Sequence, residues 1–127
     1  MGLLLAFFSI ITELAGFRVE LAYEIVKPLK YVDIFVICSF VAVSEELFFR
    51  AFILEEMRKA GTAVALIFSS ILFAFFHISY HSFTETAGAF LMGVLLGELY
   101  IKKGVFPATV AHFISNTISM TFMKIAM

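Results

Sequence analysis

The chain has 127 residues, of which 62% are hydrophobic and only 15% are charged, with a mean hydropathy of +1.04 and a formal net charge of −1. Soluble domains average about 45–50% apolar and about 25% charged residues, and a chain this short leaves much of its surface exposed, so the composition argues for a surface covered by lipid. The single cysteine, Cys38, excludes a disulfide framework within the chain, and no basic run indicates binding to nucleic acid. These features predict an all-α protein, a polytopic transmembrane bundle of about five helices.

The first of these helices is predicted in the N-terminal part of the chain, from its apolar residues. Residues 2–16 are almost wholly apolar and lack the basic n-region and cleavage site of a signal peptide. This helix is expected to continue towards residue 26, either in the membrane or at its interface. Pro28 marks a break, because proline cannot continue the backbone hydrogen-bond ladder. We therefore divide the chain into an N-terminal membrane helix with an amphipathic connection, residues 1–30, and a core, residues 31–127.

The core predicts four further helices. The first runs over about residues 31–57, which at ~1.5 Å per residue is long enough to cross a ~30 Å hydrocarbon layer with some tilt. In a later helix, Gly93 and Gly97 stand four residues apart, a small-residue pattern that lets helices approach closely in lipid. The remaining predicted helices are residues 63–79, 86–101 and 105–126.

The basic residues leave the membrane orientation undecided. If all five helices span, the connections alternate between two sides, and each side carries four basic residues, so the positive-inside rule gives a tie. One group is Arg18, Lys27, Lys30 and Lys124, and the other is Arg58, Lys59, Lys102 and Lys103.

Three of the predicted helices carry polar residues at membrane depth, where such residues are costly and by default suggest function. Glu46 and Arg50 stand four apart and can form an ion pair on one helix face. Glu45 is turned by about 100° from Glu46, so it can serve a different partner. The full set is Glu45, Glu46, Arg50, His77, His112 and Asn116.

Each of these residues also has a structural interpretation when taken alone. The acid–arginine pair can hold the bundle together, and His112 and Asn116 can make hydrogen bonds between helices. His77 alone can be a histidine at the edge of a loop, and His81 is interpreted as a surface turn residue. The functional interpretation depends on two of the three histidines lying on helices that can converge on one acidic pair.

Such a set could hydrolyse a bond without a covalent nucleophile. A carboxylate beside a histidine can hold and deprotonate water, and a second histidine with an asparagine amide can donate hydrogen bonds to a developing oxyanion. A catalytic zinc held by Glu45, His77 and His112 is the alternative. The helical HExxH signature is absent, so these ligands would come from three separate helices.

Three short motifs carry a resemblance to a known family. EELFFR at 45–50 fits EExxxR, FAFFH at 73–77 fits FxxxH, and HFISN at 112–116 fits HxxxN. In this order, on successive membrane helices, they resemble the CPBP family of intramembrane proteases. That family includes the type II CAAX prenyl endopeptidases and the bacteriocin-processing and self-immunity (Abi) proteins. The resemblance covers about residues 35–122 and makes residues 31–127 the expected catalytic core.

The resemblance implies an intramembrane endopeptidase that needs no cofactor, with a zinc-dependent protease as the alternative. Glu45 would activate water with the assistance of His77, and the ion pair within the first motif would support Glu45. His112 and Asn116 would form the oxyanion site. The family often has glycine where this chain has Ala51.

The expected partners and location follow from the same resemblance. The substrate would be a peptide or protein, one carrying a lipid anchor included, and the chain would be a multi-pass protein of a bacterial cell membrane. Family members usually carry further helices before this core, so three alternatives are open: a minimal core, a fragment, or a chain whose further partner is a second copy or a helper membrane protein. The alternative from another class is a non-catalytic immunity or interaction protein on the same scaffold. A transporter or channel subunit is less well supported, because inverted repeats and broken helices are missing.

Overall fold

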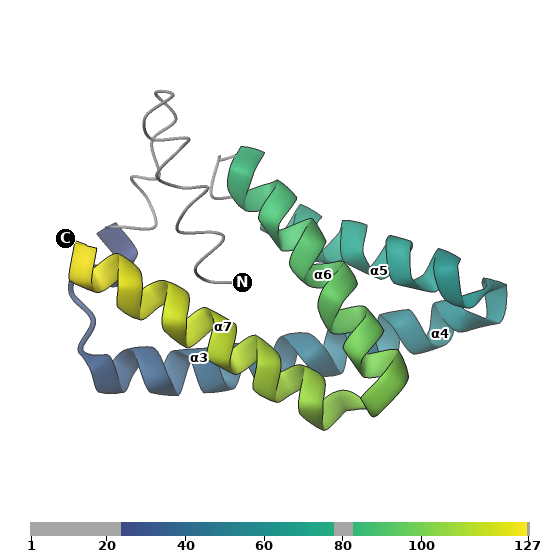
Figure 1. The fold of residues 1–127 in the computed structure, drawn as a ribbon, viewed down its shortest axis with the longest axis horizontal. Coiled ribbons are helices and arrows are strands. Elements are labelled where there is room, and N and C mark those ends of the chain that lie inside the picture. Colours follow the sequence, from purple (N-terminus) through teal and green to yellow (C-terminus); the bar gives the residue numbers. More distant parts are fainter. Residues whose placement is uncertain (1–23, 78–82, 127) are drawn as a thin grey trace.

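The computed structural model describes residues 24–77 and 83–126 (Figure 1). These residues are almost entirely helical and contain no β-strand, which confirms the predicted all-α class. The elements are α3 (Tyr31–Glu46), the π-helix η1 (Leu47–Leu54), α4 (Glu55–Met57), the 3-10 helix η2 (Arg58–Ala60), α5 (Thr62–Phe76), α6 (Phe83–Lys103) and α7 (Val105–Ala126).

The four helices predicted in the core are all present. The helix expected over residues 31–57 corresponds to α3, η1 and α4, which follow one another without a break. The helices α5, α6 and α7 correspond to the other three predictions. The helix predicted over residues 2–16 lies outside the described residues. Within 24–77 and 83–126, none of the helices combines the length and the hydropathy that crossing a membrane requires.

The π-helix η1 was not predicted from the sequence. The backbone N–H of Glu55 donates to the carbonyl of Arg50, five residues earlier, whereas an α-helix would use the fourth preceding carbonyl. Segments of π-helix are rare and often occur at functional sites. Here the segment begins directly after the acidic pair and contains Arg50.

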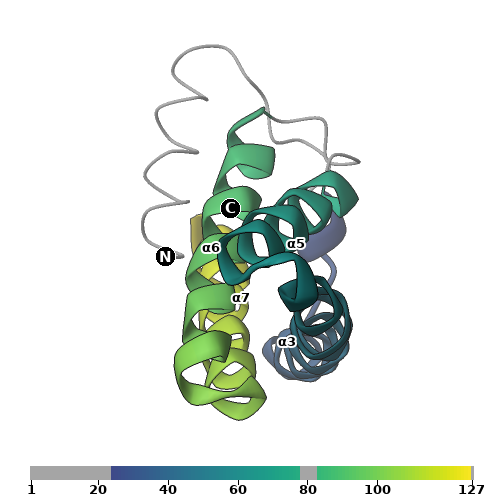
Figure 2. The ribbon, with the colours of Figure 1, turned by 90° about the vertical axis from the view of Figure 1, so that its right-hand side faces the viewer.

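The long helices form two antiparallel pairs. In Figure 1, α7 (yellow) lies along α3 (blue), and α5 packs against α6. The segment η1 contacts all four of these helices, and α6 also contacts α7. Figure 2 looks at the end of the molecule where the chain turns from α4 into α5 and from α6 into α7. These two turns use Gly61 (φ 120°) and Gly104 (φ 91°), in a backbone region that residues with a Cβ rarely adopt.

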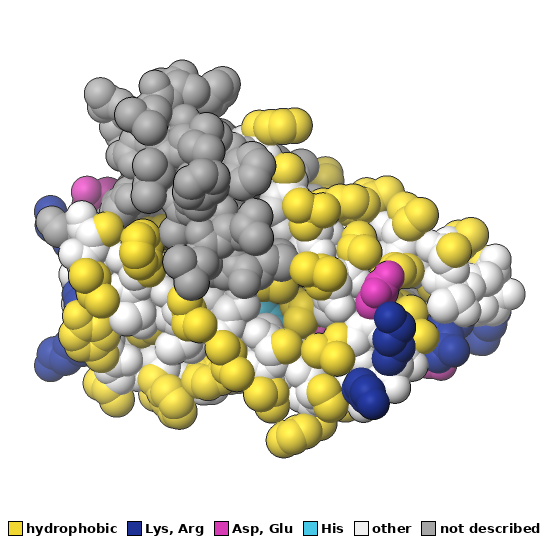
Figure 3. Space-filling view, in the orientation of Figure 1, with side chains coloured by type: hydrophobic (Ala, Val, Ile, Leu, Met, Phe, Trp, Pro, Cys, Tyr) yellow, Lys and Arg dark blue, Asp and Glu magenta, His cyan; other side chains and the backbone are white. Residues whose placement is uncertain are grey.

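The surface is apolar along the middle of the molecule and charged at its two ends (Figure 3). Large side chains such as Phe40 and Phe106 are exposed, each at 76%. At one end, Lys124 Nζ donates to the carbonyl of Lys27 at 3.2 Å. At the other, the Tyr100 hydroxyl donates to Glu55 at 3.0 Å. The two ends correspond to the two basic groups expected from the sequence, apart from Arg18, which lies outside the described residues.

Candidate active site

The acidic pair closes α3, and its two members have different surroundings. The Glu46 side chain is fully buried, whereas the Glu45 side chain is 26% exposed. Adjacent positions on a helix point about 100° apart, so one carboxylate enters the core and the other reaches its edge. The sequence predicted that the Glu45 and Glu46 side chains would point in different directions.

Glu46 forms the predicted ion pair with Arg50, whose Nη1 lies 3.1 Å from Glu46 Oε1. This contact has the distance of an ion pair but lacks the alignment of a hydrogen bond. Arg50 is 1% exposed, and its Nη2 donates to the Gly93 carbonyl of α6 at 3.2 Å. The guanidinium carbon also lies 4.5 Å from the centre of the Phe73 ring, within the range of a cation–π contact. Three groups therefore contact the Arg50 guanidinium: the Glu46 carboxylate, the Gly93 carbonyl and the Phe73 ring.

His112 of α7 connects both acids. Its Nδ1 donates to Glu46 Oε1 at 2.7 Å, and its Nε2 lies 3.5 Å from Glu45 Oε2. An ionised carboxylate can only accept, so Nδ1 of His112 donates in this hydrogen bond. His112 is 2% exposed. The sequence grouped His112 with the site but did not predict that it lies between the two carboxylates.

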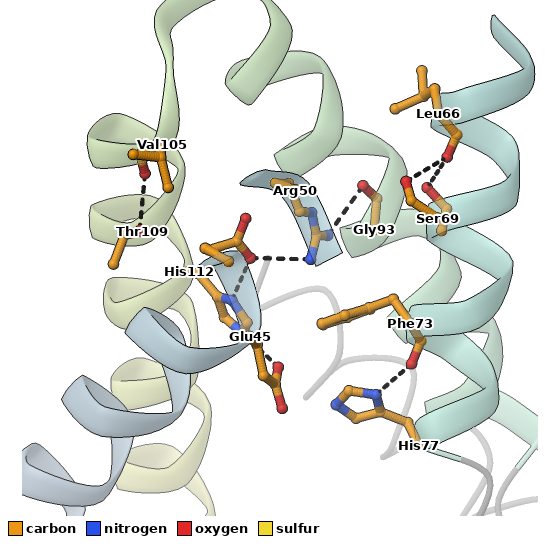
Figure 4. Close-up of polar contacts among 12 residues, drawn as sticks. Glu45, Arg50, Leu66, Ser69, Phe73, His77, Gly93, Val105, Thr109 and His112 are labelled. Carbon is orange, nitrogen blue, oxygen red and sulfur yellow. Dashed lines mark hydrogen bonds and ion pairs between the residues drawn. The ribbon is translucent and has the colours of Figure 1, made fainter. Parts of the chain in front are cut away.

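His77 follows the last residue of α5, and its Nδ1 donates to the Phe73 carbonyl at 2.7 Å. A carbonyl can only accept, so the neutral ring carries its lone pair on Nε2. In Figure 4, His77 and Glu45 point towards one another from α5 and α3. The structure thus places the acceptor nitrogen of one residue and the carboxylate of the other on the same side of the site.

Phe73 forms the apolar wall predicted beside His77. Its ring centre lies 4.6 Å from that of His77 and 5.7 Å from that of His112. Phe73 is 2% exposed and also packs edge-on against Phe49 of η1. A single ring therefore separates the two histidines and contacts the arginine.

Asn116 lies one helical turn after His112 on α7 and is half-buried. Within the described part of the chain, its side chain makes no hydrogen bond. Its spacing places it on the His112 side of α7, as the sequence predicted. His81, interpreted as a surface turn residue, lies outside the described residues.

The donor set does not fit a metal ion. Among the described residues, no three histidine, cysteine or acidic side chains lie close enough together to hold one. In particular, Glu45, His77 and His112 do not form such a group. One ring nitrogen of each histidine is engaged by an oxygen of the protein, Glu46 Oε1 for His112 and the Phe73 carbonyl for His77.

Two contributors to the site were missed by sequence reasoning. The Gly93 carbonyl belongs to the backbone, so no side-chain motif can reveal it, although the Gly93–Gly97 spacing did predict a close helix approach at this point. The contact of Phe73 with Arg50 joins residues from two different motifs. It could be found only by knowing that α5 packs against η1.

One comparison with known proteins gives a match. The family model described as type II CAAX prenyl endopeptidase Rce1-like matches residues 27–118, which is more than half of the chain and includes all six candidate site residues. No curated protein and no solved structure matches the chain.

Proposed function

The chain belongs to the Rce1-like family of type II CAAX prenyl endopeptidases, and we propose that it is an intramembrane endopeptidase in which Glu45 activates the attacking water. Membership confirms the resemblance seen in the motifs. It also implies a protease that acts on a peptide or protein substrate, within a family that is membrane-embedded. Beyond family membership, we propose a mechanism, a role for each site residue and a multi-pass location in the membrane.

The state of the Glu45 carboxylate carries the proposal. Its side chain is 26% exposed, whereas that of Glu46 is fully buried. Among the described residues, Oε2 of neither acid makes a hydrogen bond, and Glu45 Oε2 lies 3.5 Å from His112 Nε2. The neighbouring Glu46 is already engaged by Arg50 and His112. A carboxylate with unused acceptor capacity beside a histidine is suited to hold and deprotonate water.

In the proposed reaction, a water molecule lies between Glu45 and His77. Glu45 takes one proton as the oxygen attacks the carbonyl carbon of the substrate, and the carbonyl becomes a tetrahedral oxyanion. His77 accepts a hydrogen bond from the same water at Nε2, which orients its lone pair. The proton on Glu45 then passes to the departing nitrogen, the carbon–nitrogen bond breaks as the carbonyl re-forms, and the products are an amine and a carboxylic acid, which keeps the second proton of the water until it ionises in solvent.

His112 and Asn116 are proposed to stabilise the oxyanion. In this proposal Nε2 of His112 carries a proton, which in the resting site faces Glu45 at 3.5 Å. The Asn116 amide, one turn further along α7, would supply a second donor. Donors aimed at developing charge in a site that excludes water contribute about 10²–10³-fold each in enzymes where they have been removed.

We also propose that lipid covers the apolar middle of the molecule, with the charged ends at the two membrane surfaces. Large exposed side chains such as Phe40 of α3 and Ile114 of α7 support this arrangement, as does the separation of charged residues on the face drawn in Figure 3. A contiguous apolar surface of this kind marks contact with a membrane or a partner.

A cleavage assay tests the proposed activity. The full chain in detergent micelles would be given a fluorogenic, farnesylated peptide that ends in a CAAX sequence. Glu45→Gln should lower the rate by at least about 100-fold, because it removes the proposed base. Glu98→Gln is the matched control, since Glu98 is exposed on α6 and pairs with Lys102. Full activity of the Glu45→Gln protein would contradict the proposal.

A further inference from the structure

The helix α6 contributes no residue to the three motifs, yet it supplies a buried acceptor to the site. Arg50 Nη2 donates to the Gly93 carbonyl at 3.2 Å, and both groups are in the core. Among the described residues, neither Nε nor Nη1 of Arg50 makes a hydrogen bond of its own, although Nη1 lies beside Glu46. The guanidinium is thus oriented by one carboxylate and one backbone carbonyl, in addition to its contact with the Phe73 ring.

The position of that carbonyl depends on how closely α6 approaches α5. A Cβ added to Gly93 would lie 2.9 Å from Ser70 Cα, 3.0 Å from Ser70 Cβ and 3.2 Å from Ser70 Oγ. The first of these atoms belongs to the backbone of α5 and cannot rotate away. The Ser70 hydroxyl is satisfied within its own helix, since it donates to the Leu66 carbonyl at 2.6 Å. The missing side chain of Gly93 and the small side chain of Ser70 together allow this approach.

We propose that Gly93 is a positioning residue for the site: its contact with Ser70 sets the place of the carbonyl that orients Arg50. Arg50 in turn holds Glu46, and Glu46 accepts the hydrogen bond that orients His112. A substitution at residue 93 therefore acts on His112 through two intermediates. The effect on catalysis rests on the proposed function, whereas the effect on Arg50 does not.

Gly97 offers a matched control on the same helix. A Cβ there would meet the ends of two leucine side chains, Leu66 Cδ1 at 2.4 Å and Leu54 Cδ1 at 3.3 Å. These atoms can move by rotation of their own side chains. The same added methyl group, one turn from Gly93, therefore leaves the α5–α6 approach and the Gly93 carbonyl in place.

The test observes Arg50 directly. The chain has three arginines, Arg18, Arg50 and Arg58, so in the full chain labelled with ¹⁵N-arginine the Arg50 side-chain resonance can be assigned by its loss in Arg50→Lys. Gly93→Ala should shift or broaden this resonance and lower kcat/KM roughly 10- to 100-fold, the range expected for a hydrogen bond to a charged group. Gly97→Ala should leave both unchanged, and adding Ser70→Gly to Gly93→Ala should restore part of both.

An unchanged Arg50 resonance in folded Gly93→Ala overturns the proposal, and so does an equal change in Gly97→Ala. If Gly93→Ala does not fold, Ser70→Thr narrows the same contact from α5 while residue 93 stays glycine, and the same change in the Arg50 resonance is expected. An unchanged resonance in that variant counts against the proposal in the same way. If the chain shows no peptidase activity, the proposed function is contradicted. The Arg50 side-chain resonance still tests the role of Gly93 in that case, because it does not depend on activity.

Discussion

The two helix pairs of this molecule are held together by different physical means. Between α3 and α7, the contact near the site is made by charged and polar groups, with His112 between Glu45 and Glu46. Between α5 and α6, it is made by close approach, with Gly93 against Ser70. Most of the candidate site residues lie in the α3–α7 pair. The α5–α6 pair determines the position of the Gly93 carbonyl, which accepts a hydrogen bond from Arg50.

This difference explains why the α3–α7 pair is expected to be more sensitive to substitution than the α5–α6 pair. Taking charges out of water is costly unless each is compensated, so the polar part of the α3–α7 contact is favourable only while Glu46, Arg50 and His112 are all present. Further along the two helices, Ile34 and Cys38 make an apolar contact with α7. A close packing contact depends on shape alone. The predictions below separate these two kinds of dependence.

The largest effect is expected from Arg50→Met, which leaves Glu46 buried without its cation. Removing one partner of a buried ion pair typically lowers the free energy of unfolding by about 3–5 kcal/mol. The change would be measured by denaturant titration in micelles. Arg58→Met is the control, because Arg58 and Glu55 are 39% and 48% exposed and such pairs contribute about 1 kcal/mol or less. Equal losses in the two variants would show that burial of the charge is unimportant here.

The next effect is expected from His77, which belongs to the second pair but faces the first. His77→Ala should lower kcat about 100-fold, because the hydrogen-bond acceptor that orients the attacking water is lost, with little change in stability because the side chain is half-buried. His77→Asn keeps a donor close to the Phe73 carbonyl, but its shorter side chain cannot place its acceptor oxygen where Nε2 of the imidazole lies, so it should be equally slow. Recovery of activity in the asparagine variant would assign His77 a structural role instead.

A smaller effect is expected from Phe73→Leu, which removes the ring shared by the two pairs. The cation–π contact with Arg50 at 4.5 Å is lost, and desolvated contacts of this kind contribute about 1–2 kcal/mol to the free energy of unfolding. Phe75→Leu is the matched control two positions away, since Phe75 is 65% exposed. If both variants lose the same stability, neither the burial of the Phe73 ring nor its contact with Arg50 contributes measurably.

No effect is expected from chelators. A metal bound by Glu45, His77 and His112 would join the two helix pairs directly, but these side chains do not form a group that could hold one in the described structure. The cleavage rate should therefore be unchanged after treatment with 1,10-phenanthroline. A rate that falls and is restored by added zinc would show that the pairs are joined by a metal.

The sequence predicted the helices and the ion pair within one helix better than the contacts between helices. Apolar runs located the four core helices, and the four-residue spacing of Glu46 and Arg50 predicted their ion pair because both lie on one helix. The glycines at 93 and 97 predicted a close approach of α6 to another helix, which Gly93 and Ser70 confirm. Each of these inferences needed only local geometry.

The contacts between helices could not be read in the same way. That His112 bonds to Glu46, 66 residues earlier, depends on how α7 is rotated about its axis against α3. The acceptor of Arg50 is a backbone carbonyl, which every residue has. The change to π-helix after Glu46 leaves no pattern in the hydrophobic residues from which it could be predicted.

The π-helix η1 has a mechanical consequence for the whole site. It lies between α3, which ends in the two acids, and the segment that leads through α4 into α5 and His77. Each residue of an α-helix turns the chain by about 100°, so removing one residue from η1 would rotate α4 and everything after it relative to α3. The winding of these eight residues therefore determines the angle at which the His77 side chain faces Glu45. Deleting a residue of η1 outside the motifs would misalign the site, although every motif residue would still be present in the sequence.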